Sequence, residues 1–470
     1  MKIVLYGAGG YLSDRIEQVE NLPDTEIVGI TDTSESVHGK KILGHIVVPF
    51  SKVYAAYDYI VITSSHASCI EDELISQNVQ RVKIKRLKEY MSIVGGGFYK
   101  RKVLMHNSTL NIHSVAAITP ILEYNGACLA IIYMLEELHK NHGYKTMIVS
   151  SQYKDEIVDY IYEKGIDILV DPQIEFNGDK VLYKIAVNYD YVIVNTLLMR
   201  KCLNYLNPLN TIWWIHESLA FYCEEQCLWN DFSEERYSLF HTFCVSSIGQ
   251  KVFSTFFPGI SSDILEYGIP DTYSQLEKKY QGKIIFAVIG FINEIKGQDI
   301  LIKAFDNMGE RYKSKCELWC IGEFKDDDIE KLIQERTAEV NSNIVIKGAL
   351  PHGTLEEIYN EIDVIVAPSR EDTVSIAITE GLMNKKMCVV SDAAGISNYL
   401  NNSENAFIFK SEDVDALTEI LCYIIDNFSS LYNVAELGRK IYEDNFLIDK
   451  VGRRIEKIFK SLSKNEKGDC

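Results

Sequence analysis

One hydrophobic pattern occurs three times along the chain. In each case a few polar or aromatic residues lead into an uninterrupted run of β-branched residues, at positions 57–62, 189–194 and 361–366. An apolar run without alternation is typical of a strand buried on both faces, as in parallel sheets covered by helices. The sequence therefore predicts three parallel sheets, one for each occurrence.

Between these runs, strand-like and helix-like segments alternate, as in residues 145–151, 154–164 and 166–170. This order is typical of βαβ units and predicts an α/β fold throughout. The three glycines at 95–97 and the polar stretch 271–283 indicate domain boundaries. The predicted units are residues 1–93, 94–272 and 273–450, followed by 451–470, with a C-terminal helix over 448–462 that crosses back over the preceding units.

Composition agrees with a folded protein of about three domains, since the chain has 470 residues, 47% of them apolar and 24% charged. The formal net charge of −19 argues against binding to nucleic acid. Pro120 and Glu123 interrupt the most apolar long segment, and no export signal precedes the strand that begins at Lys2. We therefore expect a cytoplasmic protein without a transmembrane anchor, and peripheral contact with the inner membrane face stays open.

A glycine-rich turn follows the first predicted strand. Gly7, Gly9 and Gly10 lead into a helix, and Asp32 ends the second strand. Glycines in this context let backbone N–H groups approach a phosphate at a helix N-terminus. Leu12 stands where a dinucleotide fingerprint has its third glycine. The alternatives are a nucleotide site and a Rossmann-like domain that binds no ligand.

The N-terminal region resembles the small nucleotide-sugar-binding domain that precedes bacterial sugar acetyltransferases and polysaccharide sugar epimerases or dehydratases. The likeness rests on the glycine turn and on residues 44–49 and 57–65. It implies that this domain binds a ligand, regulates or docks, and that the chemistry lies elsewhere.

The segment 368–381 carries the most informative motif. It follows a predicted buried strand and leads into a helix whose expected start is near Val374. The amides and the dipole of such a helix favour an anion, and a diphosphate fits there. Asp372 lies just before the helix and Glu380 one turn inside it. Eight residues of helix span about 12 Å, close to the distance between ribose and sugar hydroxyls in an extended nucleotide sugar.

This carboxylate–seven residues–Glu spacing resembles the donor-binding motif of family 4 retaining glycosyltransferases, over most of residues 100–460. The resemblance implies a GT-B fold, with two Rossmann-like lobes facing a cleft, here preceded by a third, small Rossmann-like domain. It implies that Glu380 holds the ribose hydroxyls and Asp372 the transferring sugar. The implied donor-binding residues are Gly290, Lys296, Asp372, Thr373, Val374, Ser375, Ile376 and Glu380.

A second motif, residues 290–297, opens the third unit. Lys296 lies in a strand-to-helix loop, where it can neutralise a leaving diphosphate or be a solvated surface lysine. Three positions depart from the family pattern. Phe291 replaces an arginine, Asp372 replaces a glutamate, and Val374-Ser375 stands where Phe-Gly is usual. With Phe291 in place, we expect Lys296 and helix amides, or Arg370, to stabilise the leaving group.

Two features of the middle unit complete the predicted site. His216 ends a predicted strand and resembles the histidine that the family places beside the donor sugar, although a lone histidine can equally be a core residue. Asn125, Gly126 and Ala127 open a helix and resemble the family's glycine loop on the acceptor side. His216 and Lys296 are the predicted catalytic residues.

By resemblance, the reaction is hexosyl transfer with retention, from a nucleotide-diphosphate sugar and without metal or cofactor. The leaving phosphate would take the acceptor proton. The expected acceptor is a glycan, a lipid-linked glycan or a glycoprotein, in a bacterial surface-polysaccharide or glycoprotein pathway. An oligomer or a pathway partner stays open. Two rival functions remain: a non-catalytic glycosyltransferase-like partner or chaperone, and a nucleotide-sugar epimerase on the same fold.

Overall fold

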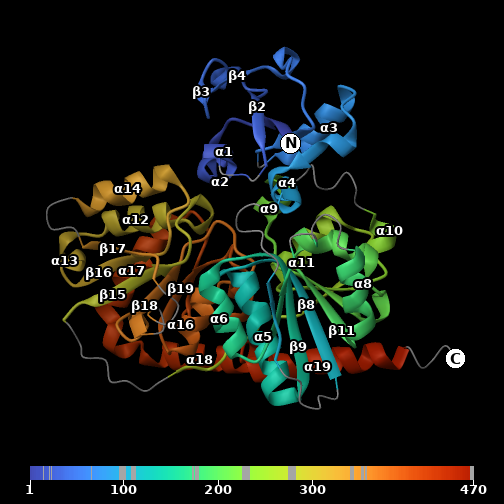
Figure 1. The fold of residues 1–470 in the computed structure, drawn as a ribbon. Helices are drawn as coiled ribbons and strands as arrows, with labels where there is room; N and C mark the ends of the chain where they lie inside the picture. The colour runs from blue at the N-terminus through green and yellow to red at the C-terminus, as the bar shows by residue number, and fades with distance from the viewer. Residues whose placement is uncertain are drawn as a thin grey trace.

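The structure is a computed structural model. It describes residues 1–13, 15–20, 22, 24–64, 66–94, 102–106, 113–171, 174, 179–224, 233–273, 282–338, 343–350, 354 and 357–465. Within these residues three sheets follow one another along the chain. Figure 1 shows the sheets as separate layers covered by helices.

The N-terminal domain contains a six-stranded sheet with the order β3-β4-β2-β1-β5-β6. All neighbours are parallel except the short β3–β4 pair. Its strands are β1 (Lys2–Tyr6), β2 (Glu26–Thr31), β3 (Lys41–Ile42), β4 (His45–Val48), β5 (Tyr59–Ile62) and β6 (Ile84–Arg86). Its α-helices are α1 (Gly10–Ser13), α2 (Ile16–Glu20), α3 (Ala67–Ser76) and α4 (Leu87–Val94).

The middle lobe contains an eight-stranded sheet with the order β14-β13-β12-β11-β8-β9-β10-β7, and only the edge strand β7 is antiparallel to its neighbour in this described sheet. The strands are β7 (Lys102–Leu104), β8 (His113–Leu122), β9 (Tyr144–Tyr153), β10 (Asp167–Val170), β11 (Tyr191–Asn195), β12 (Thr211–Ile215), β13 (His241–Cys244) and β14 (Ser262–Ile264). The helices include α5 (Gly126–His142), α6 (Asp155–Glu163), α8 (Asp179–Asn188), the 3-10 helix η4 (Leu197–Tyr205), α9 (Leu219–Glu224), α10 (Glu234–Tyr237) and α11 (Ser247–Phe256).

The C-terminal lobe contains a fully parallel six-stranded sheet with the order β17-β16-β15-β18-β19-β20. Its strands are β15 (Ile284–Ile289), β16 (Cys316–Ile321), β17 (Ile344–Gly348), β18 (Val364–Ala367), β19 (Met387–Ser391) and β20 (Phe407–Phe409). Its helices include η7 (Glu294–Lys296), α12 (Gln298–Asn307), α13 (Glu310–Lys313), α14 (Asp327–Thr337), α16 (Ile376–Met383), α17 (Val414–Asn427), α18 (Tyr432–Asn445) and α19 (Ile448–Asn465).

The prediction of an α/β fold with three Rossmann-like units is therefore confirmed. The β-branched runs of the sequence form β5, β11 and β18, each near the centre of its sheet. The sheets differ from purely parallel ones at β3 and β7, which lie at sheet edges. None of the described helices is both long and apolar enough to cross a bilayer.

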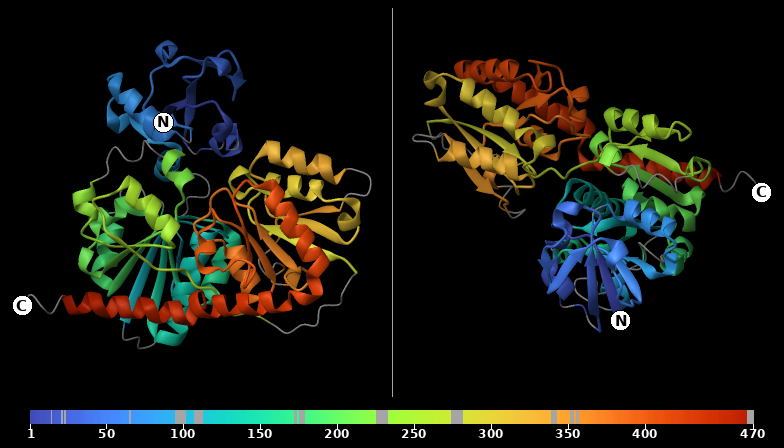
Figure 2. Two further views of the ribbon diagram at one scale, coloured as in Figure 1. Left: turned by 180° about the vertical axis from the view of Figure 1, so that it is seen from behind. Right: turned by 90° about the horizontal axis from the view of Figure 1, so that it is seen from above.

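The two lobes share one hydrophobic core, whereas the N-terminal domain has cores of its own. Ile131 of α5, Ile378 of α16 and Ile455 of α19 belong to the same buried cluster. The N-terminal sheet is packed by two separate clusters. Figure 2 shows, in its right-hand view from above, that the N-terminal domain lies over the middle lobe.

Helix α19 links the lobes by running beneath both of them (Figure 2, left). Val451, Ile455, Phe459 and Leu462 are buried and recur every three or four residues, so one face of the helix is apolar. The Phe459 ring stacks on the Tyr191 ring of β11 with 4.2 Å between centroids. The C-terminal end of the chain thereby becomes part of the middle lobe.

Replacing Phe459 tests this link. Because the ring is fully buried, we expect Phe459→Ala to destabilise the lobe pair by about 3–5 kcal/mol. Urea unfolding followed by tryptophan fluorescence measures the loss. The matched control is Lys460→Ala on the same helix, whose side chain is 63% exposed and pairs with Glu456 at 2.9 Å. Equal midpoints for the two variants would contradict the link.

Candidate functional site

The loop between β18 and α16 carries most of the predicted site residues. Helix α16 begins at Ile376, and Ser375 is its N-cap, with the side-chain oxygen accepting from the Ile378 N–H. The expected start near Val374 was therefore wrong by two residues. A serine side chain satisfies an amide at this point, which lets the preceding residues stay extended. Ile376 belongs to the first turn of the helix, whereas the Val374 and Ser375 amides precede it.

Lys296 and Asp372 form an ion pair at the centre of this region. The Lys296 Nζ donates to Asp372 Oδ2 at 2.6 Å. The 3-10 turn that carries Lys296 is capped by Asn293, and it ends at Gly297, where φ is 71°. An added Cβ on Gly297 would lie 2.1 Å from the Pro368 carbonyl oxygen. Only glycine permits this approach, which brings the Lys296 turn against the β18–α16 loop.

Arg370 is held by acids and is not directed at the cleft. Its guanidinium binds both carboxylate oxygens of Asp299, at 2.7 and 2.9 Å, and also donates to Glu412 at 2.9 Å. These hydrogen bonds to Asp299 raise the pKa of Arg370. Although burial acts in the opposite direction, the bonds from Arg370 and Lys303 lower the pKa of Asp299. The alternative in which Arg370 neutralises a leaving group was therefore wrong, because its charge is already balanced.

His216 lies at the end of β12, with its ring 4.7 Å from that of Trp214. Its Nε2 is buried and has no hydrogen-bond partner among the described residues. Burial lowers the pKa of His216 to about 3, so the imidazole is neutral at physiological pH. The His216 carbonyl oxygen accepts from Thr373 Oγ1 at 2.9 Å. This bond joins the middle lobe to the β18–α16 loop.

The predicted acceptor-side loop meets the same helix. Asn125 caps α5 by accepting from the Cys128 N–H at 2.9 Å. An added Cβ on Gly126 would lie 3.4 Å from Ile376 Cδ1. The Ala127 carbonyl accepts from Asn195 at the end of β11. The structure therefore brings Asn125–Ala127 to the first turn of α16.

Glu380 lies further along α16, where its Oε2 accepts from the Tyr359 hydroxyl at 2.6 Å. Burial and the Glu380 charge raise the pKa of Tyr359. Glu380 and Tyr359 line a cavity of about 280 Å³ between the lobes. Tyr133 and Lys164 of the middle lobe lie on its opposite side. The sequence gave no signal for Tyr359, Tyr133 or Lys164, because their proximity arises only from lobe packing.

Gly290 follows β15 with φ at 135°. An added Cβ on Gly322, which follows β16, would lie 1.8 Å from the Gly290 carbonyl oxygen. The two strand-end loops therefore touch. Phe291 beside them is 41% exposed, and the Lys325 Nζ lies 5.2 Å from the centre of its ring.

The glycine turn of the N-terminal domain lies apart from these residues. Asp32 accepts from the Ala8 N–H at 2.6 Å and from the Ser34 N–H at 2.8 Å, so its carboxylate closes the turn. Gly7 has φ at 118°, and an added Cβ would lie 2.5 Å from the Thr63 carbonyl oxygen. Gly9 and Gly10 have open space where a Cβ would lie.

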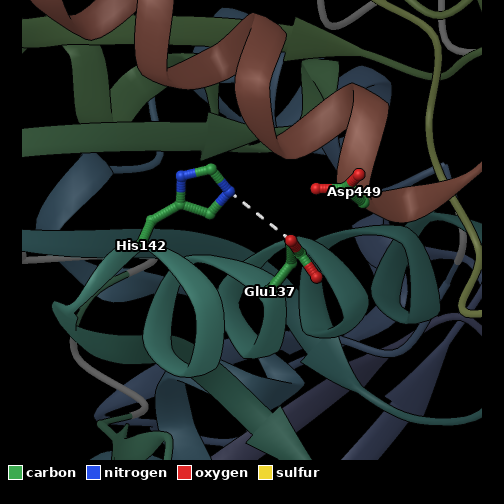
Figure 3. A group of neighbouring side chains, drawn as sticks. All are labelled: Glu137, His142 and Asp449. Atoms are coloured by element: carbon green, nitrogen blue, oxygen red, sulfur yellow. Dashed lines mark ion pairs between the residues drawn. The ribbon is translucent and has the colours of Figure 1, made fainter.

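One group of potential metal ligands occurs among the described residues, where α5 meets α19. Glu137, His142 and Asp449 have ligand atoms within 4.8 Å of one another (Figure 3). Both Asp449 oxygens accept from Arg453, and His142 Nδ1 lies 3.5 Å from Glu456. Their charges are thus compensated in pairs, and we interpret the group as an ionic junction between the helices.

Comparison with known proteins places the two lobes. Residues 113–232 match the family model described as glycosyl-transferase family 4, and residues 282–427 match glycosyl transferases group 1. Residues 1–85 match the model described as C2185-like, N-terminal. Two uncharacterized glycosyltransferases of Methanocaldococcus jannaschii are 20% and 21% identical over 37% and 40% of the chain. The chain spans about half the length of these relatives, 43% and 48%.

Solved structures share the fold of the lobe pair. Anabaena HepE in complex with UDP-glucose covers 74% of the chain and is itself covered in full, with a TM-score of 0.62 and 14% identity. Sucrose-phosphate synthase from Thermosynechococcus elongatus covers 75% and is also covered in full, with a TM-score of 0.61 and 12% identity. WaaG, a glycosyltransferase involved in lipopolysaccharide biosynthesis, covers 73% and is covered to 99%, with a TM-score of 0.56 and 13% identity. The chain is thus a GT-B protein with family 4-type glycosyltransferase domains, preceded by a C2185-like N-terminal domain.

Proposed function

We propose that the chain is a retaining, metal-independent glycosyltransferase that uses a nucleotide-diphosphate sugar. One observation carries the proposal: the Lys296–Asp372 pair and the start of α16 meet His216 and Gly126 of the facing lobe. A cation, a helix N-terminus and a carboxylate are what a diphosphate sugar requires. The HepE structure, which shares the fold, contains UDP-glucose.

Lys296 and the first turn of α16 are proposed to hold the diphosphate. The first amides of an α-helix lack partners within the helix and favour an anion. In a chain with a formal net charge of −19, such local groups have to supply the attraction. Phe291 adds no charge and Arg370 is paired with Asp299. The leaving group therefore depends on Lys296.

Asp372 is proposed to exchange partners when the donor binds. Without donor, Asp372 neutralises Lys296 at 2.6 Å. An incoming diphosphate competes for the lysine, and the freed carboxylate can then accept from hydroxyls of the sugar. Thr373 beside it stays bonded to the His216 carbonyl. The pair thus keeps the lysine positioned until the donor arrives.

Glu380 is proposed to accept from the ribose hydroxyls. The Tyr359 hydroxyl occupies one oxygen of the carboxylate and fixes its orientation. A buried carboxylate held by a neutral donor retains a second oxygen for a ligand hydroxyl. The cavity of about 280 Å³ beside it provides space between the lobes.

In the proposed reaction the bond from the anomeric carbon to phosphate breaks and a bond to the acceptor oxygen forms on the same face. The acceptor proton passes to the leaving phosphate oxygen. His216, being neutral, can hydrogen-bond to the sugar without adding charge. We place the acceptor among glycans, lipid-linked glycans and glycoproteins of a cytoplasmic surface-polysaccharide or glycoprotein pathway, supported by the fold shared with WaaG. For the N-terminal domain we propose binding or docking.

The role of Lys296 can be measured without knowing the acceptor. Loss of a charge-assisted contact of about 1.5–3 kcal/mol should weaken UDP binding by about 10- to 150-fold in Lys296→Ala. Isothermal titration calorimetry gives the dissociation constants. Lys331→Ala, which removes an exposed lysine of α14, should bind UDP like the wild type. Unchanged affinity in Lys296→Ala would place the diphosphate elsewhere.

The stereochemistry can be tested once glycans and lipid-linked glycans have been screened for an acceptor. We expect UDP release that depends on the acceptor, an α-linked product from UDP-glucose in the NMR spectrum, and full activity in EDTA. A β-linked product or loss of activity in EDTA would contradict the proposed mechanism. A sugar isomer without UDP release would instead indicate an epimerase, and no turnover would indicate a non-catalytic partner.

The protonation of His216 gives a pH prediction. Since burial lowers its pKa to about 3, its ring signals should not shift between pH 8 and pH 5 in histidine-selective NMR spectra. Assignment comes from the signal missing in His216→Asn. The sign for stability follows: the unfolded chain takes up this proton below about pH 6.5 whereas the folded chain does not. Stability should thus fall on acidification, and less so in His216→Asn. A ring that titrates near pH 6.5 would refute the neutral role.

A further inference from the structure

A cavity of about 770 Å³ separates the N-terminal domain from the middle lobe. From the N-terminal domain it is lined by residues around the ends of β5 and β6 and by the start of α3, which Figure 1 labels above the middle lobe. From the middle lobe it is lined by residues 198–202 of η4. Its volume falls in the range of about 300–1,000 Å³ that small-molecule sites occupy.

Basic side chains dominate the lining. Five of the lining residues are positive and two are negative, an excess of three charges in a chain of net charge −19. The positive residues are Arg81, Lys85, Arg86, Arg200 and Lys201, and the negative residues are Glu71 and Glu89. Such a local reversal of sign attracts an anion.

The acids position the basic groups without neutralising all of them. Arg86 Nη2 donates to Ser68 Oγ at 2.7 Å and lies 3.6 Å from Glu71. Lys85 pairs with Glu89 at 2.6 Å. Arg200, on the opposite wall, is only 4% exposed and yet lines the cavity. A buried arginine beside an open volume is costly unless an anionic group can approach it.

The cavity also lies where open α/β sheets bind ligands. β1 pairs with β2 on one side and with β5 on the other, so the strand order reverses beside β5. Ligands collect outside the carboxyl ends of strands at such a point. Ala67 and Ser68, the first residues of the ten-residue helix α3, line the cavity there. Helix start and arginines therefore favour the same kind of ligand.

The middle-lobe wall is firmly anchored. η4 begins at Leu197, whose N–H donates to Glu217 Oε1 at 2.6 Å, and the other oxygen of Glu217 accepts from the His216 N–H at 3.0 Å. Burial raises the pKa of Glu217 although these bonds oppose the effect. The basic residues of η4 are thus fixed relative to the end of β12.

We propose that this cavity is a second anion site, which binds the phosphate groups of a small molecule between the N-terminal domain and the middle lobe. The site is separate from Lys296 and Asp372. It also differs from the predicted glycine turn, because the Asp32 carboxylate is occupied by the Ala8 and Ser34 amides. Nucleotides and lipid diphosphates share this chemistry.

The experiment uses the full-length chain with Lys296→Ala, so that the proposed donor site is weakened, and inorganic pyrophosphate as the probe in calorimetry. Pyrophosphate should still bind, and the added changes Arg86→Gln and Lys201→Gln should weaken binding at least 10-fold. Lys331→Gln in the same background should have no effect. Circular dichroism checks the fold, and Lys85→Gln replaces the double change if the latter unfolds.

No pyrophosphate binding in Lys296→Ala, or binding that the cavity substitutions leave unchanged, overturns the second site. Because the donor site is tested by UDP binding to Lys296→Ala alone, the two proposals can fail independently. UDP and farnesyl diphosphate then serve as further probes. Tighter binding of the first supports a nucleotide in the cavity, and tighter binding of the second supports a lipid diphosphate.

Discussion

The arrangement of the site depends on one loop that is bonded to both lobes. Within its own lobe, Arg370 of the β18–α16 loop holds Asp299 of α12. Towards the middle lobe, the Glu371 carboxylate accepts from the Ala220 N–H at 2.9 and 3.1 Å, and Thr373 donates to the His216 carbonyl. Asp372 lies between these anchors. Its distance to groups on either lobe is therefore set by hydrogen bonds within two residues of it, and not by the average position of the domains.

Close backbone approach makes these bonds possible, and the shared core keeps them. An added Cβ on Gly395 would lie 1.9 Å from the Thr373 carbonyl oxygen, and one on Gly126 would contact Ile376. Beneath them, apolar residues of both lobes pack as one cluster that includes α19. At the junction, an added Cβ on Gly452 would lie 2.7 Å from Glu137 Cγ. Opening the lobes would expose this core, so the lobe pair resembles one packed body more than two hinged domains.

The sequence predicted what local pattern determines. The run at 361–366 forms β18, whose four residues are buried because the sheet is covered on both faces. The start of α16 was misplaced because the Ser375 side chain, and not the hydrophobic period, decides where the helix begins. The engagement of Arg370 by Asp299 and the bond from Tyr359 to Glu380 could not be predicted. They join residues 71 and 21 positions apart, and such pairs form only through the packing of different elements.

The N-terminal domain shows why a motif has to be judged by what its side chains contact. The Asp32 carboxylate, which the glycine turn suggested as a nucleotide ligand, is used to close that turn. The basic residues after β6 carry no recognisable motif, yet they face η4 across the cavity. A chain with a net charge of −19 repels anions at long range, and binding must rely on short-range groups. The C-terminal lobe meets this constraint with Lys296 and one helix start, whereas the domain interface meets it with side chains from both of its walls. An anion at that interface would contact both domains, and would thereby stabilise the position of a domain that has a core of its own.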